Sequence, residues 1–230
     1  MTVQDFLRAL DAVIGERHML QHPFYQLWNE GALTLPILRE YAKEYYLHVH
    51  FFPTYVSATH SRCHDLAIRQ MLLENLFEEE HGPDNHPELW LRFAEALGVS
   101  RQEIFRHHHL PQTRAAVELL RELSARPNPA EGLASLYAYE SQVPEVAAVK
   151  IEGLTRYYGI TDERGLSFFT VHIRADEIHR AVLREALAQV CTTAHDRERA
   201  LEAAAEAADA LNLLLDGVYQ TYCMRPNPVG

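Results

Sequence analysis

The spacing of apolar residues constrains the fold more than any other feature of this sequence. Long stretches repeat apolar residues at every third or fourth position, which is the period of one helical face. No stretch sustains the alternation of apolar and polar residues that a half-buried strand needs, and only ten glycines interrupt the chain. The sequence therefore predicts an all-α fold.

Two long helices are predicted most clearly. The first begins at Thr34, a typical N-cap residue, with Pro36 in the first turn and with Leu33 and Leu38 placed to form a hydrophobic staple. One face of this helix is predicted to carry Ile37, Tyr41, Tyr45, His48 and Phe52. The last begins near Asp196 and carries one apolar stripe. Turn residues separate further helices at about 3–15, 64–81, 86–97, 111–125, 129–158 and 167–190.

These elements predict a single bundle of about seven to eight helices. The chain has no internal repeat and no low-complexity linker, and 230 residues suffice for one domain with a full core. We expect one domain over residues 1–225 and a C-terminal tail at 226–230.

Charge and composition argue against several classes of protein. The chain has 21 Lys and Arg against 32 Asp and Glu, so nucleic acid and anionic membranes are poor candidate partners. No window approaches the roughly 20 consecutive apolar residues of a membrane-spanning helix. Charged residues near the start interrupt any signal peptide. We therefore expect a cytoplasmic protein, and the sequence leaves open whether it forms a homodimer.

Histidine is more informative than cysteine in this chain. Cys63, Cys191 and Cys223 are odd in number and far apart, which is typical of reduced thiols. The fourteen histidines indicate metal or proton chemistry. Among them, the run His107 to His109 reads as a polar cluster on the surface.

One string, FFTVHIRADEIHR at residues 168–180, carries three metal-type donors on one helical stripe. His172, Asp176 and His179 are spaced by four and then three residues, so they share a narrow sector of a helix. Asp176 and His179 repeat the carboxylate and histidine spacing of di-iron bundles. A lone histidine is more often an ordinary polar residue. Three donors among apolar neighbours instead indicate a buried site whose groups need partners.

Two further segments supply carboxylates. Glu140 lies in an apolar helix, and Pro144 cannot donate to its carbonyl, so we expect a kink that either serves packing or opens the helix wall beside a site. Glu78–Glu80 end another helix, where acids oppose the macrodipole unless a cation or solvent compensates them. His81 and His86 flank the turn that follows. Spacing alone does not choose among these residues, and mixed oxygen and nitrogen donors suit iron and manganese.

The HxxxDxxH string and the segments YAYESQVPE and EEEHGPDNH resemble the haem-oxygenase-like di-metal oxidases. The resemblance runs from HPFYQLW near the start to the last helix. It is strongest to the subgroup of the Chlamydia protein associating with death domains, and more distant to the pyrroloquinoline quinone synthases (PqqC) and the TenA-like thiaminases. It implies two divalent ions, iron and/or manganese, held by Glu79, His86, Glu140, His172, Asp176 and His179.

For this subgroup the resemblance implies that p-aminobenzoate, a folate precursor, forms with O₂ and an external reductant while the protein consumes one of its own tyrosines. Tyr25 matches the consumed residue, and Lys150 matches the donor of the amino nitrogen. Tyr41 and Tyr139 match tyrosines that relay oxidising equivalents. Phe168 departs from the subgroup, because a tyrosine can stand there, and any relay that needs this hydroxyl is in doubt.

Three other functions compete with this interpretation. A di-metal oxidase could act on an external small molecule with the same ligands. A PqqC-like or TenA-like enzyme would need no metal, although the cysteines lie outside the clusters that a thiaminase nucleophile would occupy. A protein that binds a death domain would leave six core-directed ligands unexplained. Tyr25 and Tyr41 could also be ordinary core aromatics, whereas Lys150 interrupts an apolar run and so needs a partner or a role.

Overall fold

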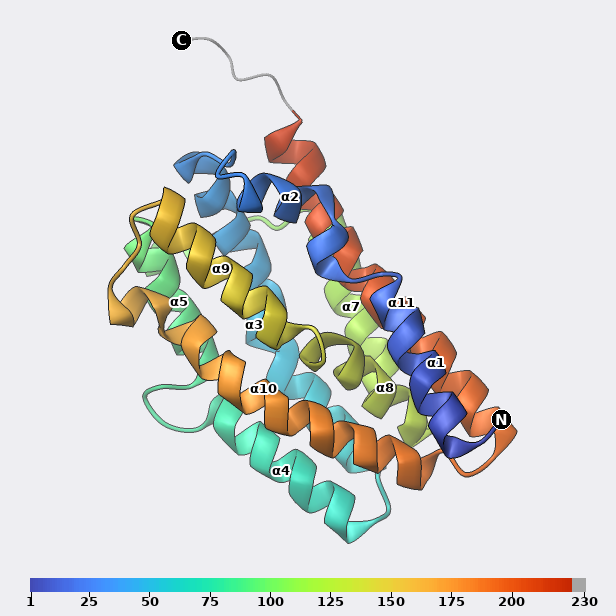
Figure 1. Cartoon of the computed structure of the whole chain (residues 1–230). Coiled ribbons are helices and arrows are strands. Elements are labelled where there is room, and N and C mark those ends of the chain that lie inside the picture. The colour runs from blue at the N-terminus through green and yellow to red at the C-terminus, as the bar shows by residue number, and fades with distance from the viewer. Residues whose placement is uncertain (225–230) are drawn as a thin grey trace.

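A computed structural model describes residues 1–224, apart from the side chains of residues 174–176. Every regular element in this part of the chain is helical, which confirms the all-α class (Figure 1). In chain order the elements are α1 (Val3–Gly15), η1 (Met19–Gln21), α2 (Pro23–Asn29), α3 (Leu35–Arg62), α4 (Leu66–Glu80), α5 (His86–Ala96), α6 (Arg101–Phe105), α7 (Pro111–Ala125), α8 (Pro129–Glu140), α9 (Val143–Tyr157), α10 (Glu163–Val190), α11 (Ala194–Val218) and η2 (Tyr219–Cys223). The tail predicted at 226–230 lies outside the described residues.

Helix α3 begins where the sequence predicts and forms one long wall of the bundle. The Thr34 side chain caps it by accepting a hydrogen bond from the backbone N–H of Ile37. The helix continues through Pro53 for 28 residues. Tyr41, Tyr45 and other members of its predicted face are buried. This wall therefore supplies aromatic side chains to the interior.

The predicted helix at 129–158 is two helices, because the break at Pro144 is sharper than a kink. Helix α8 ends at Glu140 and α9 begins at Val143. Gln142 fixes the turn between them: its side chain accepts from the Met19 backbone N–H and donates to the Ala138 carbonyl. Glu140 therefore stands at a helix end, with its carboxylate in the core.

Helix α8 is the most enclosed element of the bundle. It packs against α7, α10 and α11, and every residue from Ala130 to Glu140 is buried. Alanines line the face of α11 that meets it, and such small side chains let two helices approach closely. The buried alanines of α11 are Ala200, Ala203, Ala204, Ala207, Ala208 and Ala210. Tyr139 and Glu140 are consequently presented to the interior by a helix that is held on several sides.

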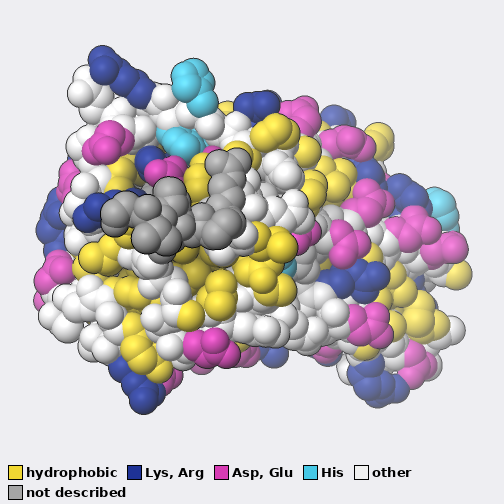
Figure 2. Space-filling model, turned by 90° about the horizontal axis from the view of Figure 1, so that it is seen from above, with side chains coloured by type: hydrophobic (Ala, Val, Ile, Leu, Met, Phe, Trp, Pro, Cys, Tyr) yellow, Lys and Arg dark blue, Asp and Glu magenta, His cyan; other side chains and the backbone are white. Residues whose placement is uncertain are grey.

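Acidic and basic side chains alternate over the face shown in Figure 2, with hydrophobic side chains gathered near its centre. This face carries no continuous basic surface. Among residues 1–224, no helix is both long enough and apolar enough to cross a membrane.

The spacing of apolar residues did not predict the short helices. Helix α2 has only seven residues and α6 only five, too few to establish an apolar stripe. The local signals for α2 are present, since His22 caps the Phe24 N–H and Pro23 stands in the first turn. Its position matters because α2 carries Tyr25.

The contact between α2 and α9 leads to a test of stability. A Cβ atom at Gly153 would lie 2.4 Å from the indole nitrogen of Trp28, which is fully buried. We expect Gly153→Ala to lower the free energy of unfolding by about 1–3 kcal/mol, the usual cost of overpacking. Urea denaturation followed by circular dichroism measures this change.

Gly15→Ala is the matched control. This glycine also lies in a helix, but a Cβ there would meet nothing within 4 Å. Its stability should be unchanged or raised by about 0.5–1 kcal/mol, because alanine is the better helix former. Equal stability of the two variants would refute the close approach of α2 to α9.

Candidate metal centre

Five of the six predicted metal ligands are buried and converge from four helices. Glu79 lies in the last turn of α4, His86 is the first residue of α5, and Glu140 ends α8. His172 and His179 lie two turns apart on α10. The side chain of Asp176, the sixth predicted ligand, lies outside the described residues.

The turn between α4 and α5 brings the first two ligands together. Gly82 has φ +81°, a left-handed conformation that glycine adopts without a steric penalty. Asn85 then caps α5 by accepting from the Glu88 N–H. As a result, the Glu79 carboxylate lies 2.8 Å from Nδ1 of His86.

Glu79, His86 and His172 form the first donor group. One ligand atom from each lies within 4.8 Å of the others, and all three side chains are buried. The rings of His86 and His172 are 4.3 Å apart between centroids. One carboxylate and two imidazoles at this spacing fit a single divalent ion.

His172 is prepared to act as a neutral ligand. Burial lowers its pKa well below the usual value, and the neighbouring His86 adds to the effect. Its Nδ1 donates to the Phe168 carbonyl, because a carbonyl can only accept. The lone pair therefore lies on Nε2, and the backbone of α10 holds the ring in this tautomer.

Glu140 and His179 form a second donor group. Nδ1 of His179 lies 3.1 Å from the Glu140 carboxylate, and its Nε2 lies 3.2 Å from Glu78. Asn75 donates to both oxygens of Glu140, at 3.0 and 3.1 Å. Because Asn75 lies one turn before Glu79 on α4, the same helix supports both groups.

The three consecutive glutamates, Glu78 to Glu80, differ in their relation to these two donor groups. Glu79 is buried in the first group, Glu78 is half-exposed and reaches His179, and Glu80 is exposed. Buried carboxylates are costly without a compensating positive charge, and a divalent cation supplies one. The described donors therefore fit metal ions, while the full set of six ligands stays a prediction.

A very small cavity adjoins the first donor group. Its space for the centre of a water-sized sphere is about 10 Å³, which is about what one water needs. The polar side of its wall is the donor group itself, and the other side is mainly aromatic and apolar. The remaining wall residues are Val49, Phe52, Tyr139 and Phe168. An aromatic ring is too large for this space.

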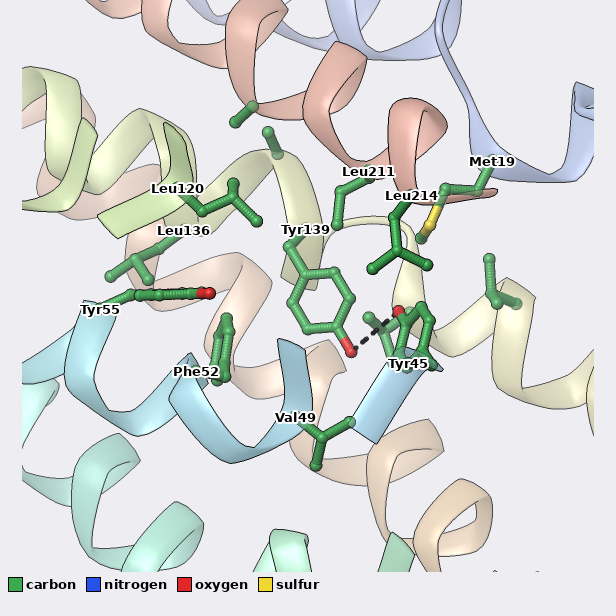
Figure 3. Packing of buried hydrophobic residues seen from close by; sticks show 14 of the residues in the cluster. Met19, Tyr45, Val49, Phe52, Tyr55, Leu120, Leu136, Tyr139, Leu211 and Leu214 are labelled. Atoms are coloured by element: carbon green, nitrogen blue, oxygen red, sulfur yellow. Dashed lines mark hydrogen bonds between the residues drawn. The ribbon is translucent and has the colours of Figure 1, made fainter. Parts of the chain in front are cut away.

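A line of four tyrosines leads away from this cavity. The hydroxyl of Tyr139 accepts a hydrogen bond from Tyr45 at 3.5 Å (Figure 3). The rings of Tyr45 and Tyr41 are 5.3 Å apart, and the hydroxyls of Tyr41 and Tyr25 are 3.5 Å apart. The structure thus brings together all three tyrosines of the prediction and adds Tyr45 between them.

Lys150 lies beside the same tyrosines in the interior. Its Nζ is 4.7 Å from the ring centroid of Tyr45, 5.2 Å from that of Tyr41 and 5.7 Å from that of Tyr25. The rings of Trp90 and Phe169 complete this aromatic surround. Burial lowers the pKa of Lys150 to about 7, so much of it is an uncharged amine near neutral pH.

Sequence reasoning did not single out Tyr45 and Trp90, which lie beside the predicted tyrosines. Tyr45 stands four residues after Tyr41 on the predicted face of α3, so the signal for it was present. Trp90 stacks on Tyr45 and also meets the edge of Phe168, which in turn lies against His172. Phe168 therefore occupies the space between a predicted ligand and the aromatic cluster without offering a hydroxyl.

The histidine run 107–109 was predicted to be a surface cluster, and it lies at the surface only in part. Only His108 is exposed, while the side chains of His107 and His109 are 12% and 15% exposed. Both face Glu44, a fully buried carboxylate of α3. Their donors form a second cluster of metal-ligating type.

Comparisons with known proteins identify the family of this chain. A family described as iron-containing redox enzymes matches residues 39–212. The chain is 40% identical to a 4-aminobenzoate synthase of Nitrosomonas europaea, over 97% of this chain and 94% of that one. It is 44% identical to a 4-aminobenzoate synthase of Chlamydia muridarum, over 92% and 89%. The solved structure of a TenA homologue from Pseudomonas syringae superposes with a TM-score of 0.79 at 17% identity, covering 94% of this chain and 92% of that one, which bears on the fold alone.

The first donor group leads to a test by metal content. His86→Ala removes one imidazole of the group, and we expect the variant to retain about one equivalent less of iron plus manganese after anaerobic loading and dialysis. It should also lose part of the rise in melting temperature that metal gives the unaltered protein. Elemental analysis and thermal unfolding measure the two effects.

His81→Ala is the control from the same turn. His81 is exposed and stacks on Phe77, away from both donor groups. Its metal content should be unchanged. A loss of metal in His81→Ala equal to that in His86→Ala would contradict the assignment.

Proposed function

The chain belongs to the haem-oxygenase-like family of iron-containing redox enzymes, and on that premise we propose that it forms 4-aminobenzoate from its own Tyr25, with Lys150 as donor of the amino nitrogen. The ring and Cβ of the tyrosine supply the carbon skeleton. Two divalent ions, iron and/or manganese, are held by Glu79, His86, Glu140, His172, Asp176 and His179. O₂ is the oxidant and an external reductant completes the electron balance.

The placement of Lys150 carries this proposal. Its amine lies among the rings of Tyr25, Tyr41 and Tyr45 in the closed interior of the bundle. A lysine there costs free energy through burial, which its lowered pKa reflects. An uncharged amine beside an oxidisable phenol is what transfer of nitrogen to a tyrosine ring requires. The names of the curated relatives support the same product.

The cavity supports an internal substrate. The cavity beside Glu79, His86 and His172 has room for about one water molecule, which is too little for a second aromatic ring. Tyr25 is already inside the protein and fully buried. Both observations support a reacting tyrosine that is part of the chain, which would supply its position and its shielding from water.

When bound, the metal ions supply the capacity to activate O₂ and to accept electrons. The chain then provides the route by which a distant tyrosine is oxidised. Tyr139 lines the cavity, and Tyr45 and Tyr41 connect it to Tyr25 through contacts of 3.5 to 5.3 Å. Burial raises the pKa of Tyr25 and Tyr41 well above the usual value, so both remain phenols until an electron is removed.

His48 is a buried imidazole that packs against two tyrosines of the line. Its ring centroid lies 4.6 Å from that of Tyr139 and 5.3 Å from that of Tyr45. Burial lowers its pKa to about 3, so the ring is neutral and has one nitrogen lone pair. Within the described residues neither ring nitrogen has a hydrogen-bond partner.

The thiaminase alternative receives no support from the cysteines. Cys63 and Cys191 are buried, and burial raises their pKa values to about 11 and about 12. Such thiols are protonated at neutral pH and are poor nucleophiles.

Isotope labelling tests the origin of the product. Protein grown with ring-labelled ¹³C tyrosine and ε-¹⁵N lysine is purified, loaded anaerobically with Fe(II) and Mn(II), and exposed to O₂ and a reductant in unlabelled buffer. We expect 4-aminobenzoate that carries both labels, and a loss of protein mass that peptide mapping places at Tyr25. The amount should not exceed one product per chain.

Tyr25→Phe and Lys150→Arg should give no labelled product, while their metal content stays unchanged. Unlabelled free tyrosine added in excess should not dilute the label. Unlabelled product would mean that the substrate is an external molecule and not Tyr25. Absence of product from the fully loaded protein would contradict the proposed activity itself.

Tyr45→Phe tests the line of tyrosines. Removing this hydroxyl breaks the contact with Tyr139, and we expect 4-aminobenzoate to form roughly tenfold more slowly, the effect of raising a barrier by about 1.4 kcal/mol. Metal content should not change, because Tyr45 belongs to neither donor group. Single-turnover kinetics after mixing with O₂ measure the rate.

Tyr55→Phe is the matched control, since Tyr55 is also buried on α3 but lies outside the line. Its rate should equal that of the unaltered protein. Equal rates for all three proteins would remove Tyr45 from the route.

A further inference from the structure

Glu44, His107 and His109 form a second cluster of metal-type donors, and none of them belongs to the centre described above. Glu44 lies on α3, and the two histidines lie between α6 and α7. One ligand atom from each lies within 4.8 Å of the others. The cluster joins α3 to the start of α7, where Leu110 is the N-cap and offers no side-chain hydrogen bond.

Glu44 is a fully buried and strongly held carboxylate. It accepts hydrogen bonds from the Leu110 backbone N–H, from the Thr113 hydroxyl at 2.6 Å and from Nε2 of His107 at 2.6 Å. Burial alone would raise its pKa, but these contacts and His109 outweigh burial and lower the pKa to about 2. Glu44 therefore carries a negative charge at neutral pH and keeps a fixed orientation.

The position of the His109 ring is not explained by hydrogen bonding. Its Nδ1 is buried and has no hydrogen-bond partner in the described part of the chain. This atom lies 3.7 Å from the nearer Glu44 oxygen, which is too far for a hydrogen bond. Buried polar atoms are seldom left without a partner.

The spacing of the cluster matches the ligands of one ion. Two ligand atoms of tetrahedral zinc, each about 2.0–2.1 Å from the metal, lie about 3.3 Å from one another. The two Glu44–histidine distances fall on either side of this value: 2.6 Å from His107 to one carboxylate oxygen and 3.7 Å from His109 to the other. A small shift of each ring would let one ion contact all three side chains.

We propose that Glu44, His107 and His109 bind one divalent ion of the zinc type, in addition to the ions of the family's own centre. The ion takes the place of the proton that Nε2 of His107 shares with Glu44, and it gives Nδ1 of His109 a partner. Leu110 and Thr113 keep their hydrogen bonds to the carboxylate and support it from behind. A water completes the four ligands.

The ion has access from solvent. A shallow hollow in the surface is lined by His107, His108, Lys43 and Arg106, among others. Lys43 is engaged by Glu40 at 2.6 Å, which limits its repulsion of an incoming cation. Once bound, the ion would tie α3 to the N-terminus of α7, and α3 carries Tyr41 and Tyr45. Zinc should therefore raise the stability of the fold without entering the line of tyrosines.

The test uses full-length protein without an affinity tag, already loaded with iron and manganese. Zinc is added at buffered free concentrations, and iron, manganese and zinc are counted per chain after dialysis. We expect about one zinc per chain, unchanged iron and manganese, and a higher melting temperature. In His107→Ala/His109→Ala the zinc affinity should fall by at least about 100-fold, since even residues that only support a metal ligand typically contribute 10- to 100-fold.

Two single variants separate ligation from folding. His109→Ala breaks no hydrogen bond of Nδ1, so it should fold as the unaltered protein does and still lose zinc affinity. His108→Ala, in the same run but exposed, should keep it. The proposal is overturned if the loaded protein takes up no zinc beyond what displaces iron or manganese. Equal zinc binding by the unaltered protein and His109→Ala, or an equal loss in His108→Ala, would overturn it as well.

Discussion

The structure depends on burying ionisable side chains inside a helical bundle. Glu79, Glu140, His172 and His179 are all nearly inaccessible to solvent. Each would cost free energy in such a place without a compensating group. The chain compensates in part with its own atoms: Asn75 donates to Glu140, and the Phe168 carbonyl holds His172. Metal ions of the family's kind would add positive charge beside these buried carboxylates.

Most of these buried ligands lie at the end of a helix and not in its middle. Glu79 closes α4, His86 opens α5 and Glu140 closes α8. A helix end lets the chain turn while its last side chain stays in the core, and Gly82 and Gln142 fix the two turns concerned. Helix α10 differs because it contributes ligands from its middle, at a spacing of seven residues. The site therefore combines one stripe of ligands along α10 with single ligands at the ends of three other helices. Only the stripe on α10 follows a regular spacing in the sequence.

This difference explains how far the sequence could predict the site. The stripe on α10 follows from helical period alone, and Pro144 located the end of α8, although as a kink. The choice of Glu79 over Glu78 and Glu80 needed the resemblance to a family, since adjacent residues have no period to separate them.

The histidines at 107 and 109 were misplaced for a related reason. Their burial comes from Glu44, more than sixty positions earlier in the chain. No local pattern reports a contact between segments so far apart. Tyr45 was different, because it stood on a face that was recognised and lacked only an assigned role.

Lys150 shows why the closed interior and the proposed chemistry belong together. Five aromatic rings surround its amine, and burial alone lowers its pKa to about 7. An open pocket would admit an external ring but would also admit water, which would restore the charge of the lysine and make its nitrogen unreactive. The aromatic packing that encloses the amine is thus also the packing that keeps it uncharged. The proposed transfer of this nitrogen to Tyr25 depends on both properties at once, because the same rings that shield the lysine from water include the ring of Tyr25.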